Sequence, residues 1–108
     1  MANNQVMLIV GTQCQIKDDA KFNKWYNEVH IPMLMKSGYV KGVSRYKAVG
    51  QAGEPPRYIA LYKFASFKDY EAHQASPALA AAIKEMQGSW GNNVELTSRI
   101  HYELIKEW

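Results

Sequence analysis

A histidine at the edge of an aromatic stripe is the feature of this chain with the clearest potential for chemistry. At about 100° per residue in a helix, Phe22, Trp25 and Tyr26 share one face. His30 then lies roughly 80° from Phe22 around the same helix, beside the stripe. Because imidazole titrates near neutral pH, His30 is the candidate general acid or base. The alternative is a histidine that packs at the helix edge and hydrogen-bonds to a carbonyl.

Other polar and aromatic side chains could bind or orient a substrate next to this histidine. The amides of Asn23 and Asn27 can donate a hydrogen bond where negative charge develops on a carbonyl or enolate, so Asn27 is the second candidate catalytic residue. Arg45 could bind a carboxylate through two hydrogen bonds. The candidates for the wall of a substrate pocket are aromatic: Trp25, Tyr26, Tyr46, Tyr58, Tyr62 and Trp90. A structural role in the core, in a salt bridge or at the surface is the alternative for each.

Length and composition predict one globular domain, residues 1–108. Hydrophobic residues make up 47% of the chain and charged residues 21%, an ordinary globular composition. The net charge of +3 is too small and too evenly spread to indicate binding to nucleic acid or to an anionic membrane surface. Apolar runs such as residues 6–10 are far too short to span a bilayer, and no signal peptide is evident.

Hydrophobic patterns predict the strands, and capping residues predict the helices. The expected strands are residues 6–10, 39–49, 57–65 and 94–105. Asp18 and Asp19 suit the N-cap and first turn of the first helix, which extends to about Lys36, with Pro32 kinking or breaking it. Ser66 begins a capping box that opens the second helix, which Pro77 divides. Residues 50–56 and 88–93 are expected to be loops.

The resulting order β-α-β-β-α-β predicts a ferredoxin-like α+β fold, with two helices on one face of a four-stranded antiparallel sheet. The other face of this sheet is expected to be apolar as well, because Ile59 and Leu61 alternate with Tyr58 and Tyr62. The last strand is expected to place Val94, Leu96, Ile100, Tyr102 and Leu104 on one face. An uncovered apolar face of this size predicts a homodimer that packs sheet against sheet.

The remaining histidines and the single cysteine give weaker signals. His73 is expected at the surface, and His101 is expected to face the dimer interface. The three histidines lack the spacing of a local metal site, so we expect no bound metal. Cys14 cannot form an internal disulfide, is expected to be a small buried residue at a strand end, and favours a reducing, cytoplasmic location.

The first helix also resembles that of a known protein family. Its residues fit the pattern F-x-x-W-Y-N-x-x-H-x-P of EthD-like proteins, which belong to the dimeric α+β barrel superfamily: Phe22, Trp25, Tyr26, Asn27, His30 and Pro32. Residues 38–39, 45–46 and 58–62 are similar to the following strands of that group, and residues 76–78 to a step in its second helix. The resemblance implies a homodimer with a pocket between the sheet and helices of each subunit. It also implies small cyclic or aromatic ligands, because relatives include cofactor-free monooxygenases, polyketide cyclases, muconolactone-type isomerases and haem-degrading enzymes.

Together these features predict a cofactor-independent enzyme of isomerase, cyclase, lyase or monooxygenase type. His30 would move a proton, while Asn27 and a nearby tyrosine or arginine would hold the polar end of the substrate. The main alternative is a non-catalytic binding or accessory protein for a hydrophobic ligand such as haem, although residues 80–84 lack the histidine of the haem-degrading relatives. A purely structural dimer also stays open. RNA recognition is disfavoured, because residues 57–64 lack the glycine of the RNA-binding pattern.

Overall fold

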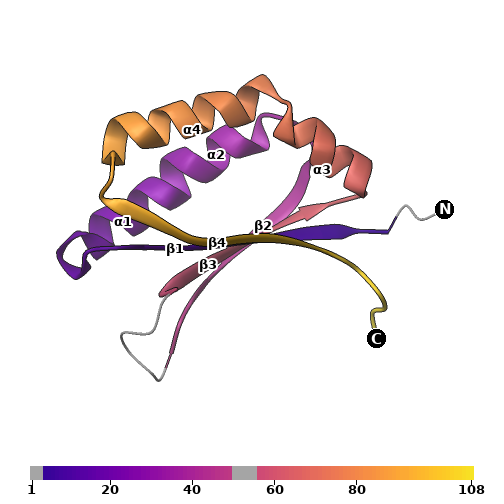
Figure 1. The fold of residues 1–108 in the computed structure, drawn as a ribbon, viewed down its shortest axis with the longest axis horizontal. Coiled ribbons are helices and arrows are strands. Elements are labelled where there is room, and N and C mark those ends of the chain that lie inside the picture. Colours follow the sequence, from indigo (N-terminus) through magenta and orange to yellow (C-terminus); the bar gives the residue numbers. More distant parts are fainter. Residues whose placement is uncertain (1–3, 50–55) are drawn as a thin grey trace.

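Four antiparallel strands form one sheet, in the order β2-β3-β1-β4 (Figure 1). The computed structural model describes residues 4–49 and 56–108. Its strands are β1 (Val6–Cys14), β2 (Val40–Lys47), β3 (Tyr58–Phe64) and β4 (Val94–Glu103). This order and the antiparallel pairing confirm the predicted ferredoxin-like α+β fold. Most of the predicted loop at residues 50–56 lies outside the described residues.

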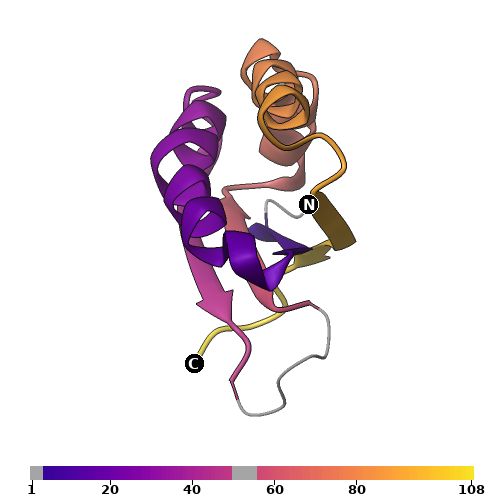
Figure 2. The ribbon, with the colours of Figure 1, turned by 90° about the vertical axis from the view of Figure 1, so that its left-hand side faces the viewer.

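The helices lie together on one face of the sheet and leave the other face uncovered (Figures 1 and 2). Between β1 and β2 the chain forms a 3-10 turn (Ile16–Asp18), α1 (Asp19–Trp25), a π-helical turn (Tyr26–His30) and α2 (Ile31–Met35). Between β3 and β4 it forms α3 (Phe67–Gln74) and α4 (Pro77–Trp90). The side chain of Ser66 accepts a hydrogen bond from the Asp69 N–H, so the predicted N-cap of α3 is confirmed.

The π-helical turn explains how the first helical segment passes Pro32 without breaking. The N–H of Ile31 donates to the carbonyl of Tyr26, five residues back, so this turn is wider than an α-helical one. Proline has no N–H, and its ring would clash with the carbonyl of Glu28 in a regular α-helix. The wide turn accommodates this ring, and the segment continues to Met35 before Gly38 adopts a φ of 82°.

The core lies between the helices and the alternating side chains of the two central strands. Tyr58, Tyr62 and Phe64 face the helices, whereas Ile59 and Leu61 point to the outer face, as predicted. Their neighbours on β1 follow the same alternation, with Val6, Leu8, Val10, Thr12 and Cys14 buried.

The α4 helix extends further than predicted. Residues 88–90 were expected to begin a loop, but the helix continues to Trp90 and ends at Gly91, which has a φ of 57°. The Trp90 side chain is only 5% exposed and packs against Phe22 and Trp25. Packing of this large indole therefore outweighs the low helix propensity of Gly88 and Ser89.

The last strand corrects the prediction that its apolar residues share one face. The register of β1 and β4 shifts at Gly11, which pairs with Ser98, while Thr12 pairs with Leu96. This bulge at Thr97 leaves Leu96 on the helix side but turns Ile100 to the outer face. Val94 shares the side of Leu96, and Tyr102 shares the side of Ile100.

The same bulge brings two polar side chains to the helix side of β4. Arg99 pairs with Val10 and His101 with Leu8, both of which face the helices. The expectation that His101 faces a dimer interface is therefore wrong. Its ring stacks on Tyr70 of α3, with centroids 4.7 Å apart.

The outer face of the sheet is apolar and accessible. Tyr46, Ile100 and Tyr102 are 50–56% exposed there, and Ile9, Ile59 and Leu61 are partly exposed between them. Within the described ranges, no helix is both long and apolar enough to cross a membrane.

Candidate functional site

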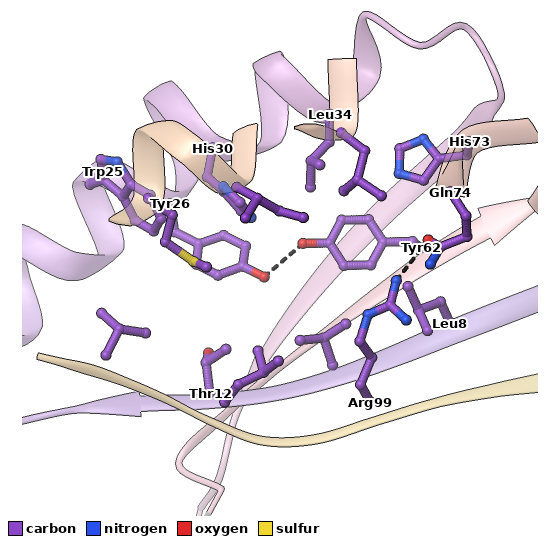
Figure 3. A pocket seen from close by; sticks show the side chains of 16 residues that line it. Leu8, Thr12, Trp25, Tyr26, His30, Leu34, Tyr62, His73, Gln74 and Arg99 are labelled. Carbon is purple, nitrogen blue, oxygen red and sulfur yellow. Dashed lines mark hydrogen bonds between the residues drawn. The ribbon is translucent and has the colours of Figure 1, made fainter. Parts of the chain in front are cut away.

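A cavity of about 340 Å³ lies between the sheet and the helices (Figure 3). This volume falls within the range of roughly 300–1,000 Å³ that is typical of small-molecule sites. Its apolar wall comes mainly from Leu8, Val10, Leu34, Leu79, Ile83, Met86, Val94 and Leu96. Its polar and aromatic lining residues are Thr12, Trp25, Tyr26, His30, Tyr62, His73, Gln74 and Arg99. The arrangement suits a largely apolar molecule with a few polar groups.

His30 enters the cavity from the π-helical turn, and its side chain is 8% exposed. The imidazole stacks on the indole of Trp25, with centroids 4.9 Å apart and planes 24° apart, and contacts the edge of Tyr26. Its buried Nδ1 has no hydrogen-bond partner among the described residues. Burial lowers the pKa of His30 to about 4, although the charge of Glu85 opposes this shift. The ring is therefore neutral at pH 7 and can accept a proton.

Two tyrosines supply hydroxyl groups on the same side of the cavity. The hydroxyls of Tyr26 and Tyr62 lie 2.6 Å apart and hydrogen-bond to each other (Figure 3). Burial raises the pKa of both phenols, so both stay protonated at neutral pH. Only one of the two O–H protons can lie between the oxygens. The other proton is therefore available to a bound molecule.

A polar cluster lies against the Tyr26 ring and outside the residues that line the cavity. The Arg45 guanidinium is 4.3 Å from the centroid of this ring. It donates hydrogen bonds of 2.8 Å to the amide oxygens of Asn23 and Asn27. The Nδ2 of Asn23 in turn donates to the hydroxyl of Tyr58 at 3.1 Å. This cluster connects the first helix to β2 and β3 and places a cation next to Tyr26.

An ion pair extends this cluster toward the end of β1. Arg57 contacts Asp19 at 2.8 Å and also donates to the backbone carbonyl of Cys14. The hydroxyl of Tyr58 donates to the other oxygen of Asp19 at 2.9 Å. Burial and then the hydrogen bond to Asp19 raise the pKa of the Cys14 thiol. A protonated thiol is a poor nucleophile, which favours the structural role predicted for Cys14.

The predicted site residues lie in four different parts of the structure. Trp25, Tyr26, His30 and Tyr62 line the cavity, whereas Asn23, Asn27, Arg45 and Tyr58 form the polar cluster. Trp90 lies in the core beside Phe22 and Trp25. Tyr46 is 56% exposed on the outer face of β2, away from the cavity.

Four polar residues of the cavity were not among the predicted site residues: Thr12, His73, Gln74 and Arg99. The expectation that His73 lies at the surface is wrong, since it is 3% exposed and packs on Phe64. Its Nδ1 lies 2.7 Å from the hydroxyl of Ser37. The alternation of β1 could have indicated Thr12, because this polar residue continues the buried series Leu8 and Val10. No sequence signal indicated Arg99, because its orientation depends on the β4 bulge.

The described part of the chain contains no group of three or more His, Cys, Asp or Glu side chains that could hold a metal ion. The polar groups in the cavity are instead phenols, imidazoles, the Thr12 hydroxyl, an amide and a guanidinium. Such groups suit hydrogen bonding and proton transfer to an organic molecule.

Comparison with known proteins first establishes the fold class. The structure is similar to HapK from Hahella chejuensis, with a TM-score of 0.74, 14% identity and 95% of each chain covered. It is also similar to an EthD family protein from Bacillus halodurans, with a TM-score of 0.71, 14% identity and coverage of 94% of this chain and 99% of that one. A hydroxynitrile lyase from Passiflora edulis gives a TM-score of 0.67, 13% identity and 99% coverage of both chains.

These similarities confirm the predicted EthD-like fold, and at such identities they show the fold alone. The chain itself belongs to the family described as "Domain of unknown function (DUF4286)", which matches residues 5–104. No curated protein sequence matches it.

Proposed function

We propose that this chain is a cofactor-independent enzyme that transfers a proton on a small cyclic or aromatic molecule, with His30 as the general base. The observation that carries the proposal is the His30 ring itself. It is buried, neutral and without a hydrogen-bond partner at Nδ1 among the described residues, in a cavity large enough for a small molecule. His30 is among the residues that line the cavity, so a ligand hydroxyl or an acidic C–H group bound there would meet this ring.

The tyrosine pair supports the same reaction. As His30 removes a proton from carbon or oxygen, negative charge develops on the substrate. The free phenolic proton of the Tyr26–Tyr62 pair would then donate to the charged oxygen, as in an oxyanion hole. The Arg45 cation against the Tyr26 ring would stabilise this charge further. We propose that Asn27 acts by positioning Arg45 and does not contact substrate.

The low pKa of His30 restricts the substrates that this base can serve. A conjugate acid with a pKa of about 4 forms readily only if an anion develops next to it. Substrates with acidic protons, such as phenols and cyclic β-dicarbonyl compounds, fit this requirement best. Isomerisation, ring closure and elimination all include such a step, and the Passiflora edulis neighbour is named as a lyase.

Hydrogen–deuterium exchange tests this function directly. The protein would be incubated in D₂O with cyclic β-diketones, phenols and lactones, and loss of the acidic ring protons would be followed by ¹H NMR. We expect catalysed exchange with at least one class of compound. His30→Gln should slow the exchange by about 10²-fold or more, because a general base contributes roughly this amount.

His101→Gln is the matched control, because this histidine stacks on Tyr70 and is not among the residues that line the cavity. Its exchange rate should equal that of the wild type. Exchange that survives in His30→Gln would refute the role of His30. Binding without exchange would favour the alternative of a binding or accessory protein, and a Soret band with haemin would identify haem as its ligand.

We also propose that two copies of the chain associate through their outer sheet faces. The support is the apolar outer face itself, where half-exposed Tyr46, Ile100 and Tyr102 surround partly buried aliphatic residues. Such an isologous contact would leave the helix side, and therefore the cavity, accessible in each subunit.

A further inference from the structure

Arg99 is the charged residue among the described residues that line the cavity (Figure 3). Its guanidinium extends from β4 toward Gln74, beside Tyr62, at the end of the cavity away from Trp25. Among the described residues that line the cavity, none is acidic. The cavity therefore combines an apolar interior with a positive charge at one end.

The contacts of Arg99 leave its charge uncompensated. One nitrogen donates to Oε1 of Gln74 at 2.7 Å, and the other lies 3.5 Å from the hydroxyl of Tyr70. Both partners are neutral, and within residues 4–49 and 56–108 the only ion pair is between Arg57 and Asp19. A guanidinium has five N–H donors, so several remain available for an incoming anion.

The neighbouring groups respond to this charge. Burial first, and then the charge of Arg99, lower the pKa of His73. Burial raises the pKa of Tyr62, and Arg99 is among the charges that oppose this rise. This lower pKa favours the neutral form of His73, which then adds no second positive charge beside Arg99. Because Arg99 is exposed, an anion bound to it would also keep contact with water, which limits the cost of desolvation.

We propose that the ligand of this cavity is a small aromatic or cyclic carboxylic acid, with its carboxylate on Arg99 and its ring among the apolar residues of α4. Leu79, Ile83 and Met86 form this apolar wall, and His30 lies beyond them near Trp25. The carboxylate would then fix the direction in which the ring enters. The substrate class deepens the proposed function and rests on it for the reaction at His30, but the binding of the acid is independent of turnover.

Matched pairs of acids and amides test this proposal by isothermal titration calorimetry. The probes are benzoate, phenylacetate, 3-phenylpropanoate and 2-naphthoate, each compared with its neutral amide. We expect at least one acid to bind the wild type about tenfold more tightly than its amide, since a hydrogen bond to a charged group contributes roughly this factor. Arg99→Gln should remove the preference, whereas Arg99→Lys should retain part of it. The affinity for the amide should stay the same in both variants.

Lys84→Gln is the matched control, because it removes one positive charge from an exposed position of α4 that does not line the cavity. It should leave both affinities unchanged. Equal binding of acids and amides, an equal loss of both in Arg99→Gln, or no binding of any acid would each overturn the proposal.

The calorimetry and the exchange measurement together separate this proposal from the proposed function. Acid binding that depends on Arg99, without any exchange dependent on His30, would uphold the ligand class and refute the enzyme. If neutral compounds exchange in a way that depends on His30, and acids are not bound preferentially, the enzyme is upheld and the ligand class is refuted.

Discussion

His30 illustrates how the position of one side chain sets its chemistry. Its ring stacks on Trp25 inside the cavity, and burial lowers the pKa to about 4, against an ordinary value of 6.5. The unfolded chain therefore binds a proton at a higher pH than the folded chain does. As the pH falls through the window from about 6.5 to about 4, protonation favours the unfolded state and the protein loses stability.

This difference in pKa predicts a pH-dependent part of the stability that belongs to His30. Between pH 7.5 and 4.5, the free energy of unfolding should fall by about 2–3 kcal/mol more in the wild type than in His30→Gln. Urea unfolding followed by tryptophan fluorescence, at one protein concentration, would measure both falls. Because burial also lowers the pKa of His73, the comparison between the two proteins isolates the share of His30. Equal falls in both would show that the folded protein does not hold His30 neutral.

The residues near His30 also show what the sequence could predict of the site. The aromatic stripe and the histidine indicated the correct helix, and Trp25, Tyr26 and His30 do line one cavity. Asn27 was predicted to orient the substrate, and the structure places its amide oxygen against Arg45. A regular helical wheel does not include the wide turn from Tyr26 to His30, which changes the directions of the side chains that follow it.

At the scale of elements, the bulge between β1 and β4 determines which residues reach the cavity. Gly11 lies at the register shift, and the two strands approach closely there. A Cβ at this position would lie 2.5 Å from Oγ1 of Thr97 and 2.7 Å from Oγ of Ser98. The absence of a side chain at Gly11 therefore lets the bulged strand pack beside β1.

We predict that Gly11→Ala destabilises the protein by about 1–3 kcal/mol, because the added methyl group overpacks this contact. Urea unfolding would measure the change in the free energy of unfolding. Gly42→Ala is the matched control within β2, since a Cβ there would meet no atom within 4 Å. It should leave stability unchanged or raise it slightly. If both variants have the stability of the wild type, the bulge adapts to a side chain at Gly11.

The bulge also limits how well the faces of the strands can be predicted from sequence. For β3, simple alternation gave the correct faces, because this strand runs without interruption along the core. For β4 the same rule predicted one face for Leu96 and Ile100, and one extra residue between them reversed the second half. The position of a bulge depends on how neighbouring strands pack, and this packing cannot be read from a single sequence.

At the scale of the whole molecule, the two faces of the sheet have different roles. The helices lie on one side of the sheet and leave the other side uncovered (Figure 2). The cavity lies on the helix side, and apolar side chains are exposed on the outer side. An apolar sheet face that packs against neither helices nor a second sheet exposes more apolar area than the surface of a monomer usually does. In the proposed homodimer, a second copy of the chain would cover this outer face.

This explanation predicts that the wild-type protein has about twice the 12.3 kDa mass of one chain in solution, and that Ile100→Arg converts it to the monomer. Ile100 is half exposed on the outer face, on the edge strand β4 beside Ile9 of β1, so an arginine there would place two like charges in an isologous contact. Sedimentation equilibrium at micromolar concentration would measure both masses.

Ile16→Arg is the matched control, because Ile16 is 78% exposed on the 3-10 turn and away from the sheet. A monomeric wild type would contradict the proposal, and a dimer that tolerates Ile100→Arg would place the interface elsewhere. A monomeric Ile100→Arg that still binds the acid probes would show that each cavity is complete within one chain, as its lining residues imply.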